Sequence, residues 1–232
     1  MHGLGSADYS GSMHEYAVLG AIMGALMLGA MSPGPSFVVV ARTAVGQSRR
    51  DGLAAALGMG VGGVTFCTLA LFGLYSVLAS VDWLYSGLRI VGGAYLVYIA
   101  VRIWRHARDP FNVDLDQTVE SAGQPRGRTA FRMGLITQLS NPKTAVVYGS
   151  IFAALLPATT SIGLKLALPL TVFAIEAGWY AVVAVAFSSG RIRDRYLRAK
   201  KWVDRVSAGV IGALGLRLIG SAFHLDGPVS PH

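Results

Sequence analysis

Six long apolar segments follow one another along this chain, and none of them alternates between apolar and polar residues. They cover residues 16–41, 53–79, 83–104, 130–156, 162–187 and 203–223. Strands of a membrane β-barrel alternate over about ten residues, and these runs are roughly twice as long. A helix that crosses the hydrocarbon core needs about 20 apolar residues. The pattern therefore predicts an all-α integral membrane protein with six transmembrane helices.

The composition supports this interpretation. Of the 232 residues, 53% are hydrophobic and 14% are charged, and the mean hydropathy is +0.52. Soluble domains carry about 25% charged residues, so the chain lacks the side chains for a polar exterior. Cys67 is the single cysteine, which excludes an intramolecular disulfide and a metal site built from cysteines.

The placement of the positive charges predicts an orientation. The net charge is +8, and sixteen of the twenty Lys and Arg residues fall between segments one and two, three and four, or five and six, or within two residues of the segment ends that border these connections. Because Lys and Arg gather on the cytoplasmic side, both termini should face outward from a bacterial inner (plasma) membrane. The basic stretch 191–205 is expected to be a cytoplasmic loop beside anionic membrane lipid, and not a nucleic-acid site.

The segments fall into two groups of three, which we expect to be two repeats. The first repeat covers 14–105 and the second 129–224, with a polar cytoplasmic linker at 106–128. Because each repeat has an odd number of crossings, the two should be inverted relative to each other. Residues 1–13 are rich in Gly and Ser and lack the basic start of a signal peptide, so they are expected to form a flexible tail. Residues 225–232 are expected to form a C-terminal tail.

Proline interrupts the first helix of each predicted repeat, helices 1 and 4 of the six. The interruptions are Ser32-Pro33-Gly34-Pro35 and Asn141-Pro142-Lys143. Proline has no N–H and clashes with a carbonyl one turn earlier, so carbonyls are freed before each break. The helix that restarts presents free N–H groups, which attract a carboxylate. A single proline would more simply be a kink. Two broken helices at corresponding places favour a transporter's binding site, so all seven residues are candidates for substrate binding.

Glu176 is the second candidate feature, since it lies near the middle of the fifth segment. A charge at that depth costs about 2.5–3.5 kcal/mol on insertion scales, so the side chain should face the interior of the bundle. There it would bind an ammonium group or carry a coupling proton. The structural alternative is a partner for Lys143 or for a backbone group.

Several short motifs together resemble the LysE/RhtB family of amino-acid exporters. Besides the two proline motifs, they are Gly93-Ala94-Tyr95-Leu96, Gly134-Leu135 and Gly212-Ala213-Leu214-Gly215. The resemblance extends over about residues 15–219 and implies proton-driven efflux of amino acids from the bacterial cytoplasm. That family often has an aspartate followed three residues later by tryptophan in the fifth segment. Here the pair is Glu176 and Trp179, so the acid is longer.

We therefore expect a secondary transporter that exports amino acids or close derivatives by alternating access, coupled to H⁺. The substrate carboxylate would meet Lys143 and the helix that restarts after Pro35. The substrate ammonium would meet Glu176 or the freed carbonyls near Met31 and Ser140. A proton arriving at Glu176 would neutralise it and release the substrate outward.

Other functions stay open. One is export of another small metabolite or drug, and another is a structural or assembly role without transport. An enzyme is not expected, because the five histidines lie outside the apolar segments and no metal-binding or nucleophile motif is present. We expect no metal and no cofactor. The glycine-rich helix faces would suit a homodimer as well as internal packing.

Overall fold

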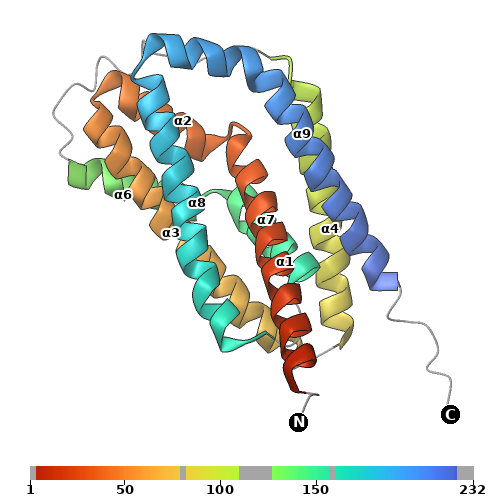
Figure 1. The fold of residues 1–232 in the computed structure, drawn as a ribbon. Helices are drawn as coiled ribbons and strands as arrows, with labels where there is room; N and C mark the ends of the chain where they lie inside the picture. Colours follow the sequence, from red (N-terminus) through yellow and green to blue (C-terminus); the bar gives the residue numbers. More distant parts are fainter. Residues whose placement is uncertain (1–3, 79–81, 110–126, 157–159, 224–232) are drawn as a thin grey trace, which may run out of the picture.

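The computed structural model describes residues 4–78, 82–109, 127–156 and 160–223, which form helices joined by short connections. The eight helices of this described part are α1 (Leu4–Met31), α2 (Pro35–Gly46), α3 (Arg49–Leu78), α4 (Asp82–His106), α6 (Gly127–Leu139), α7 (Pro142–Leu155), α8 (Ile162–Phe187) and α9 (Gly190–Phe223) (Figure 1). The all-α prediction is confirmed for these residues.

Three of these helices are long and apolar enough to cross a bilayer, within the ranges that the structure describes. They are α3, α8 and α9, over Arg49–Gly73, Ile162–Phe187 and Asp194–Phe223. The pair α1 and α2 meets the same criterion together, over Glu15–Met31 and Pro35–Gly46, with a bend of 59° at the break. The six crossings and the two inverted repeats stay a prediction, because α4 and the pair α6 and α7 fall outside this group.

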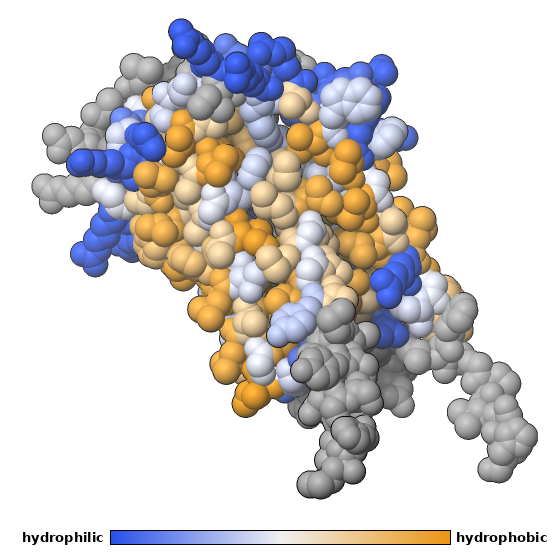
Figure 2. All heavy atoms as spheres, viewed as in Figure 1, coloured by the Kyte–Doolittle hydropathy of each residue, from blue (hydrophilic) through white to orange (hydrophobic). Residues whose placement is uncertain are grey.

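The outside of the bundle is apolar along its length and charged at one end. Leu69 on α3 is 61% exposed, and Leu166 and Leu170 on α8 are 66% and 74% exposed. Figure 2 shows a hydrophobic flank and a hydrophilic end, which is the end where α9 begins in Figure 1. Large leucines that face outward on long helices fit contact with lipid tails. The chain therefore has the exterior of a membrane protein.

Glycines bring the helices into close contact. A Cβ on Gly58 of α3 would collide with the carbonyl oxygen of Phe131, and a Cβ on Gly134 of α6 would collide with that of Ala55. On the other side of the bundle, a Cβ on Gly93 of α4 would lie 2.7 Å from the Gly215 carbonyl oxygen of α9. Small residues at such contacts let helix backbones approach each other. Gly58, Gly93 and Gly134 thus serve packing within the chain.

The N-terminal end of the chain differs from the sequence expectation. α1 begins at Leu4, so a helix occupies most of the segment 1–13 that we expected to be a flexible tail. This segment has no proline, and nothing in its backbone forces the helix to begin later. Most of the predicted linker, at 110–126, and the predicted tail 225–232 lie outside the described residues.

The basic stretch 191–205 is also helical, and the expectation of a loop was wrong. α9 begins at Gly190 and includes the whole stretch, and its first part lies across one end of the bundle (Figure 1). One turn of this helix is held by an ion pair, in which Lys200 Nζ lies 2.9 Å from Asp204 Oδ2. Arg191, Arg195 and Arg198 are exposed. The positive charges therefore lie on a helix whose other face packs on the bundle.

Candidate functional site

The first break lies between α1 and α2. α1 ends at Met31, and Gly34 precedes α2 in an extended conformation with φ −150° and ψ −171°. Pro35 takes the first position of α2, where its missing N–H is not needed by the helix. The helix restarts with the Val38 N–H donating to the Gly34 carbonyl at 3.0 Å. The chain thus bends by 59° between α1 and α2, and the second helix begins directly after the break.

The second break lies between α6 and α7 and is built in the same way. Asn141 caps α7, and Pro142 takes the first position of the helix. The Asn141 side-chain oxygen accepts from the Lys143 N–H at 3.0 Å. A capping side chain of this kind satisfies one of the N–H groups that a helix start leaves open. Lys143 is therefore held at the first turn of α7, with its side chain free to extend toward the other break.

Lys143 joins the two breaks. Its ammonium donates to the Ser32 carbonyl oxygen at 3.0 Å and to the Gly29 carbonyl oxygen at 3.3 Å. These oxygens belong to the end of α1, where the break removes the usual helical donors. The Lys143 chain also passes over Gly34, where a Cβ would lie 3.6 Å from both Cδ and Nζ. A cation at one break thus compensates the open carbonyls of the other.

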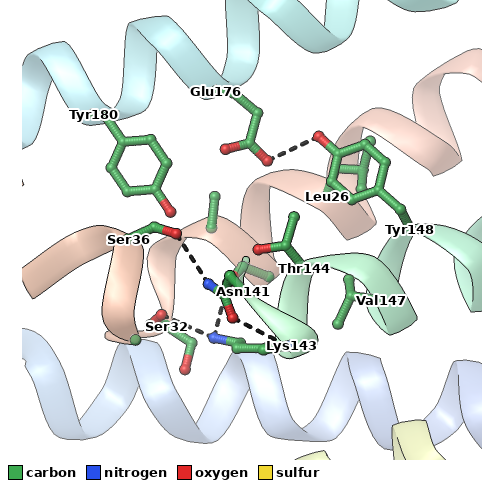
Figure 3. Close-up of a pocket in the computed structure, with 13 residues that line it drawn as sticks. Leu26, Ser32, Ser36, Asn141, Lys143, Thr144, Val147, Tyr148, Glu176 and Tyr180 are labelled. Carbon is green, nitrogen blue, oxygen red and sulfur yellow. Dashed lines mark hydrogen bonds between the residues drawn. The ribbon is translucent and has the colours of Figure 1, made fainter. Parts of the chain in front are cut away.

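A chain of buried hydrogen bonds runs from the breaks to Glu176, and Figure 3 shows its first bond, between Asn141 and Ser36, and its last, between Tyr148 and Glu176. Asn141 Nδ2 donates to Ser36 Oγ at 2.9 Å, and Ser36 Oγ donates to Gln138 Oε1 at 2.6 Å. Gln138 Nε2 then donates to Glu176 Oε2 at 3.2 Å. Tyr148 completes the chain, since its hydroxyl donates to Glu176 Oε1 at 2.9 Å. All donors point toward the carboxylate, so each bond supports the next.

Glu176 therefore has two donors, one for each oxygen, and is 3% exposed. A carboxylate that accepts on both oxygens is satisfied as an anion. Lys143 donates to backbone carbonyls instead, so the direct pair of Lys143 with Glu176 that the sequence left open is not formed. The site thus holds a cation and an anion that do not pair with each other. Lys143 is hydrogen-bonded to backbone carbonyls, and Glu176 is hydrogen-bonded to uncharged side chains.

The space between the breaks is a narrow cavity. Both charged groups line it, as do the polar side chains of Ser32, Ser36 and Asn141. About 30 Å³ of this space admits the centre of a water molecule, which is room for about two or three waters. An amino acid is larger than that. Its binding in this cavity would require the helices around the breaks to move apart.

Five of the eight candidate residues line this cavity: Ser32, Gly34, Asn141, Lys143 and Glu176. The prolines Pro33, Pro35 and Pro142 do not line it, and Pro35 and Pro142 are exposed. Proline acts there through the backbone, because it fixes where each helix begins.

Sequence reasoning missed five polar residues of the site, namely Ser36, Gln138, Thr144, Tyr148 and Tyr180. Three of them take part in the hydrogen-bond chain, and the Tyr180 hydroxyl points toward Ser36 (Figure 3). One signal was available, because Ser36 follows the first break directly and Gln138 precedes the second within an apolar segment. A polar side chain that is buried beside a break requires a partner. The partner of Ser36 is Gln138, and Gln138 in turn donates to Glu176.

The family profile of the LysE type translocator matches residues 27–222, which include both breaks and Glu176. The chain belongs to the LysE type translocator family. The resemblance noted from the sequence motifs is thereby confirmed. No solved structure matches the chain.

Curated relatives extend over most of this LysE type translocator. The threonine efflux protein of Escherichia coli (strain K12) is 29% identical over 194 residues, covering 82% of this chain and 91% of that protein. An uncharacterized membrane protein of the same strain, YahN, is 32% identical over 197 residues, covering 85% and 86%. The leucine efflux protein of Enterobacter sp. (strain 638) is 24% identical, covering 83% and 88%.

Proposed function

We propose that this protein exports amino acids or close derivatives from the bacterial cytoplasm, coupled to protons and by alternating access. The observation that carries the proposal is the cavity between the two helix breaks, where Lys143 and Glu176 lie on opposite walls. An amino acid is a zwitterion, so its binding site needs one cationic and one anionic side chain. The family and the relatives named for threonine and leucine efflux support the same class of substrate.

The substrate carboxylate would bind at Lys143. The ammonium of Lys143 is held by two carbonyl oxygens, and it keeps a third donor for a carboxylate. The start of α2 adds its open N–H groups, which favour an anion. Of the two positions expected for the substrate ammonium, Glu176 is the better one. Glu176 lines the cavity, whereas Met31 does not, and the Met31 carbonyl accepts from the Tyr196 hydroxyl at 3.1 Å.

A proton on Glu176 would change the hydrogen-bond chain in a defined way. The Tyr148 hydroxyl both donates and accepts, so it can turn and accept from a protonated Oε1. Gln138 Nε2 only donates and therefore stays on Oε2. The neutral acid has no charge left for the substrate ammonium. Protonation thus weakens substrate binding without breaking the contact of Glu176 with Gln138.

Alternating access would use the two repeats of the chain, with one repeat moving against the other around the site. In this proposal α1 to α4 form one repeat and α6 to α9 the other, six crossings in all. Packing is consistent with the pairing, since α3 packs against α8 and α4 against α9, which are the matching helices of the two halves. The breaks then lie at the middle of the molecule, where one half can rock against the other.

The orientation completes the proposal. The hydrophilic end in Figure 2, where α9 begins, would face the cytoplasm of a bacterial inner membrane. The start of α1 and the end of α9 would then face outward. We also propose membrane lipid and a second copy of the chain, in a homodimer, as partners. The substrate is a small amino acid and the coupling ion H⁺.

Efflux from intact cells tests the export function. Cells that overproduce the protein are fed dipeptides, and the medium is followed for the common amino acids and homoserine. Lys143→Met removes the cation of the cavity. Lys165→Met is the matched control, since Lys165 is exposed at the first turn of α8. We expect faster release of one or a few amino acids with the wild type and the control, and background release with Lys143→Met.

Two results would contradict the proposal. If no amino acid is released faster than in cells without the protein, export concerns another solute. If Lys143→Met releases amino acids at the wild-type rate, the cavity is not the binding site. The amount of folded protein in the membrane is measured for each variant, so that a folding defect is distinguished from lost transport.

A further inference from the structure

A second cavity lies on the outside of the bundle, in a groove between α4 and α9. Its volume is about 290 Å³. Val97, Val101 and Leu216 supply an apolar lining, and Gly209 and Gly212 form its floor along α9. The groove is separate from the cavity at the helix breaks, since the two have no lining residue in common.

The glycines open this groove. A Cβ placed on Gly209 would meet no heavy atom within 4 Å, so the hollow above it is not filled by a neighbouring side chain. Gly209, Gly212 and Leu216 follow each other at intervals of three and four residues and so share one face of α9. The facing wall on α4 runs from Val97 to Arg105, a length of about 12 Å along the helix. One leaflet of a hydrocarbon core is about 15 Å thick, which is similar.

One end of the groove is cationic and aromatic. Arg105 lines the groove and is exposed. The Arg205 guanidinium lies over the rings of Trp104 and Trp202, 5.2 Å and 5.8 Å from their centroids. Lys201 adds its ammonium 5.7 Å from the Trp202 centroid. Tryptophan with basic side chains is typical of the level of lipid headgroups.

The described lining of the groove contains no acidic side chain that would balance these positive charges. The nearest acid on the same stretch of α9 is Asp204, and it is already paired with Lys200 at 2.9 Å. The groove therefore combines an apolar channel with an unbalanced positive end. Basic pockets between transmembrane helices on the cytoplasmic side are suited to anionic lipid headgroups.

We propose that this groove binds one anionic phospholipid. The phosphate contacts Arg105 and Arg205, and an acyl chain lies over Gly209 and Gly212. A second copy of the chain fits less well. In a two-fold symmetric pair with a common membrane orientation, the same surface meets itself, so the two basic ends would be brought together.

Native mass spectrometry of the full chain, purified in detergent and freed of lipid, tests this site. The probes are phosphatidylglycerol and phosphatidylcholine with identical acyl chains. We expect the wild type to bind one phosphatidylglycerol more tightly than phosphatidylcholine. Each basic side chain contributes about fivefold to attraction of an anionic lipid. Arg105→Gln with Arg205→Gln should therefore weaken phosphatidylglycerol binding about 25-fold. The control pair is Arg128→Gln with Arg132→Gln, two exposed positions on α6.

Filling the groove tests the acyl-chain part separately. Gly209→Leu places a side chain in the open space, and Gly220→Leu is the matched control because it is also an exposed α9 glycine whose added Cβ meets nothing within 4 Å. We expect Gly209→Leu to lose the lipid and Gly220→Leu to keep it. The proposal is overturned if both lipids bind equally, if Gly209→Leu binds phosphatidylglycerol like the wild type, or if the wild type is a dimer that Gly209→Leu separates.

Discussion

The rings of Phe37 and Tyr196 are stacked, with centroids 5.2 Å apart and planes 21° from parallel. Phe37 lies on α2 directly after the first break, and Tyr196 lies on the first part of α9. The Tyr196 hydroxyl also reaches the other side of the break, where it donates to the Met31 carbonyl at 3.1 Å. One side chain of α9 thus holds both ends of the break, and the start of α9 is tied to the candidate site.

Tyr196→Phe tests whether this tie controls access to the cavity. The variant keeps the stacked ring and loses the hydrogen bond, which is worth about 1 kcal/mol. We expect the break to open about fivefold more often. Access is measured by thiol labelling of Ser32→Cys, which lines the cavity, in inverted membrane vesicles. The native Cys67 is fully buried and gives a low background.

The control for this labelling is Tyr98→Phe. Tyr98 is 54% exposed on α4 and lies outside the cavity lining. Equal labelling rates in the presence of Tyr196→Phe and of Tyr98→Phe would show that the hydroxyl does not control access to the break.

Glu176→Gln tests the coupling role of the carboxylate. The amide has almost the same shape and cannot take up a proton. We expect net export to lose its response to an imposed pH gradient. Exchange of internal for external substrate should continue, but at higher substrate concentrations, because the neutral amide binds the substrate ammonium more weakly. Both rates are measured in proteoliposomes with labelled substrate. Full export that is still driven by the pH gradient would exclude Glu176 as the proton carrier.

Glu15→Gln is the control for this substitution. Glu15 lies on α1 and accepts from Ser161, with Oε2 2.8 Å from the serine oxygen, and it does not line the cavity. Its export should respond to the pH gradient like the wild type. The comparison separates loss of a carboxylate in general from loss of this one.

Tyr148→Phe tests the donor to Glu176. Phe keeps the ring beside Phe66 and Phe152, where the centroid distances are 5.9 Å and 6.2 Å. Only the hydroxyl is lost, and a hydrogen bond to a charged group contributes about 1.5–3 kcal/mol. We expect the export rate at low substrate concentration to fall at least tenfold. Tyr95→Phe on α4 should export normally, and an equal loss in both variants would contradict the role of Tyr148.

Local sequence signals predict the helix ends well where a cap is present. The fifth apolar segment and α8 have the same bounds, 162–187. Ser161 caps this helix, since its side-chain oxygen accepts from the Leu164 N–H at 3.1 Å. The breaks are predictable for a similar reason, because proline fixes the first position of α2 and of α7. These features depend on neighbours within one turn of the chain.

Contacts between distant segments could not be predicted in this way. Gln138 and Glu176 belong to different helices, and only the packing of α6 and α8 on α3 brings them together. The basic stretch of α9 is another case. Its charges predict an exposed loop. In the structure it forms the first part of α9, because the aromatic ring of Tyr196 packs on Phe37. The sequence pattern does not show which partner a polar or aromatic side chain will find.

The contact between α3 and α6 offers a stability test with opposite expected signs. Gly134→Ala would push its Cβ against the Ala55 carbonyl oxygen, and overpacking of this kind costs about 1–3 kcal/mol. Gly149→Ala on α7 meets nothing within 4 Å, so the better helix propensity of Ala gains up to about 1 kcal/mol. Thermal unfolding in detergent should therefore show a lower midpoint for the first variant and an unchanged or higher one for the second.

Export measured on the same two variants connects this contact to the site. Gln138 lies one helical turn after Gly134 and donates to Glu176. A displaced α6 therefore moves the donor away from the carboxylate. We expect Gly134→Ala to export less per folded molecule, and Gly149→Ala to export like the wild type. If Gly134→Ala lowers the midpoint and leaves export per folded molecule unchanged, the position of α6 does not affect Glu176, and the glycine serves packing alone.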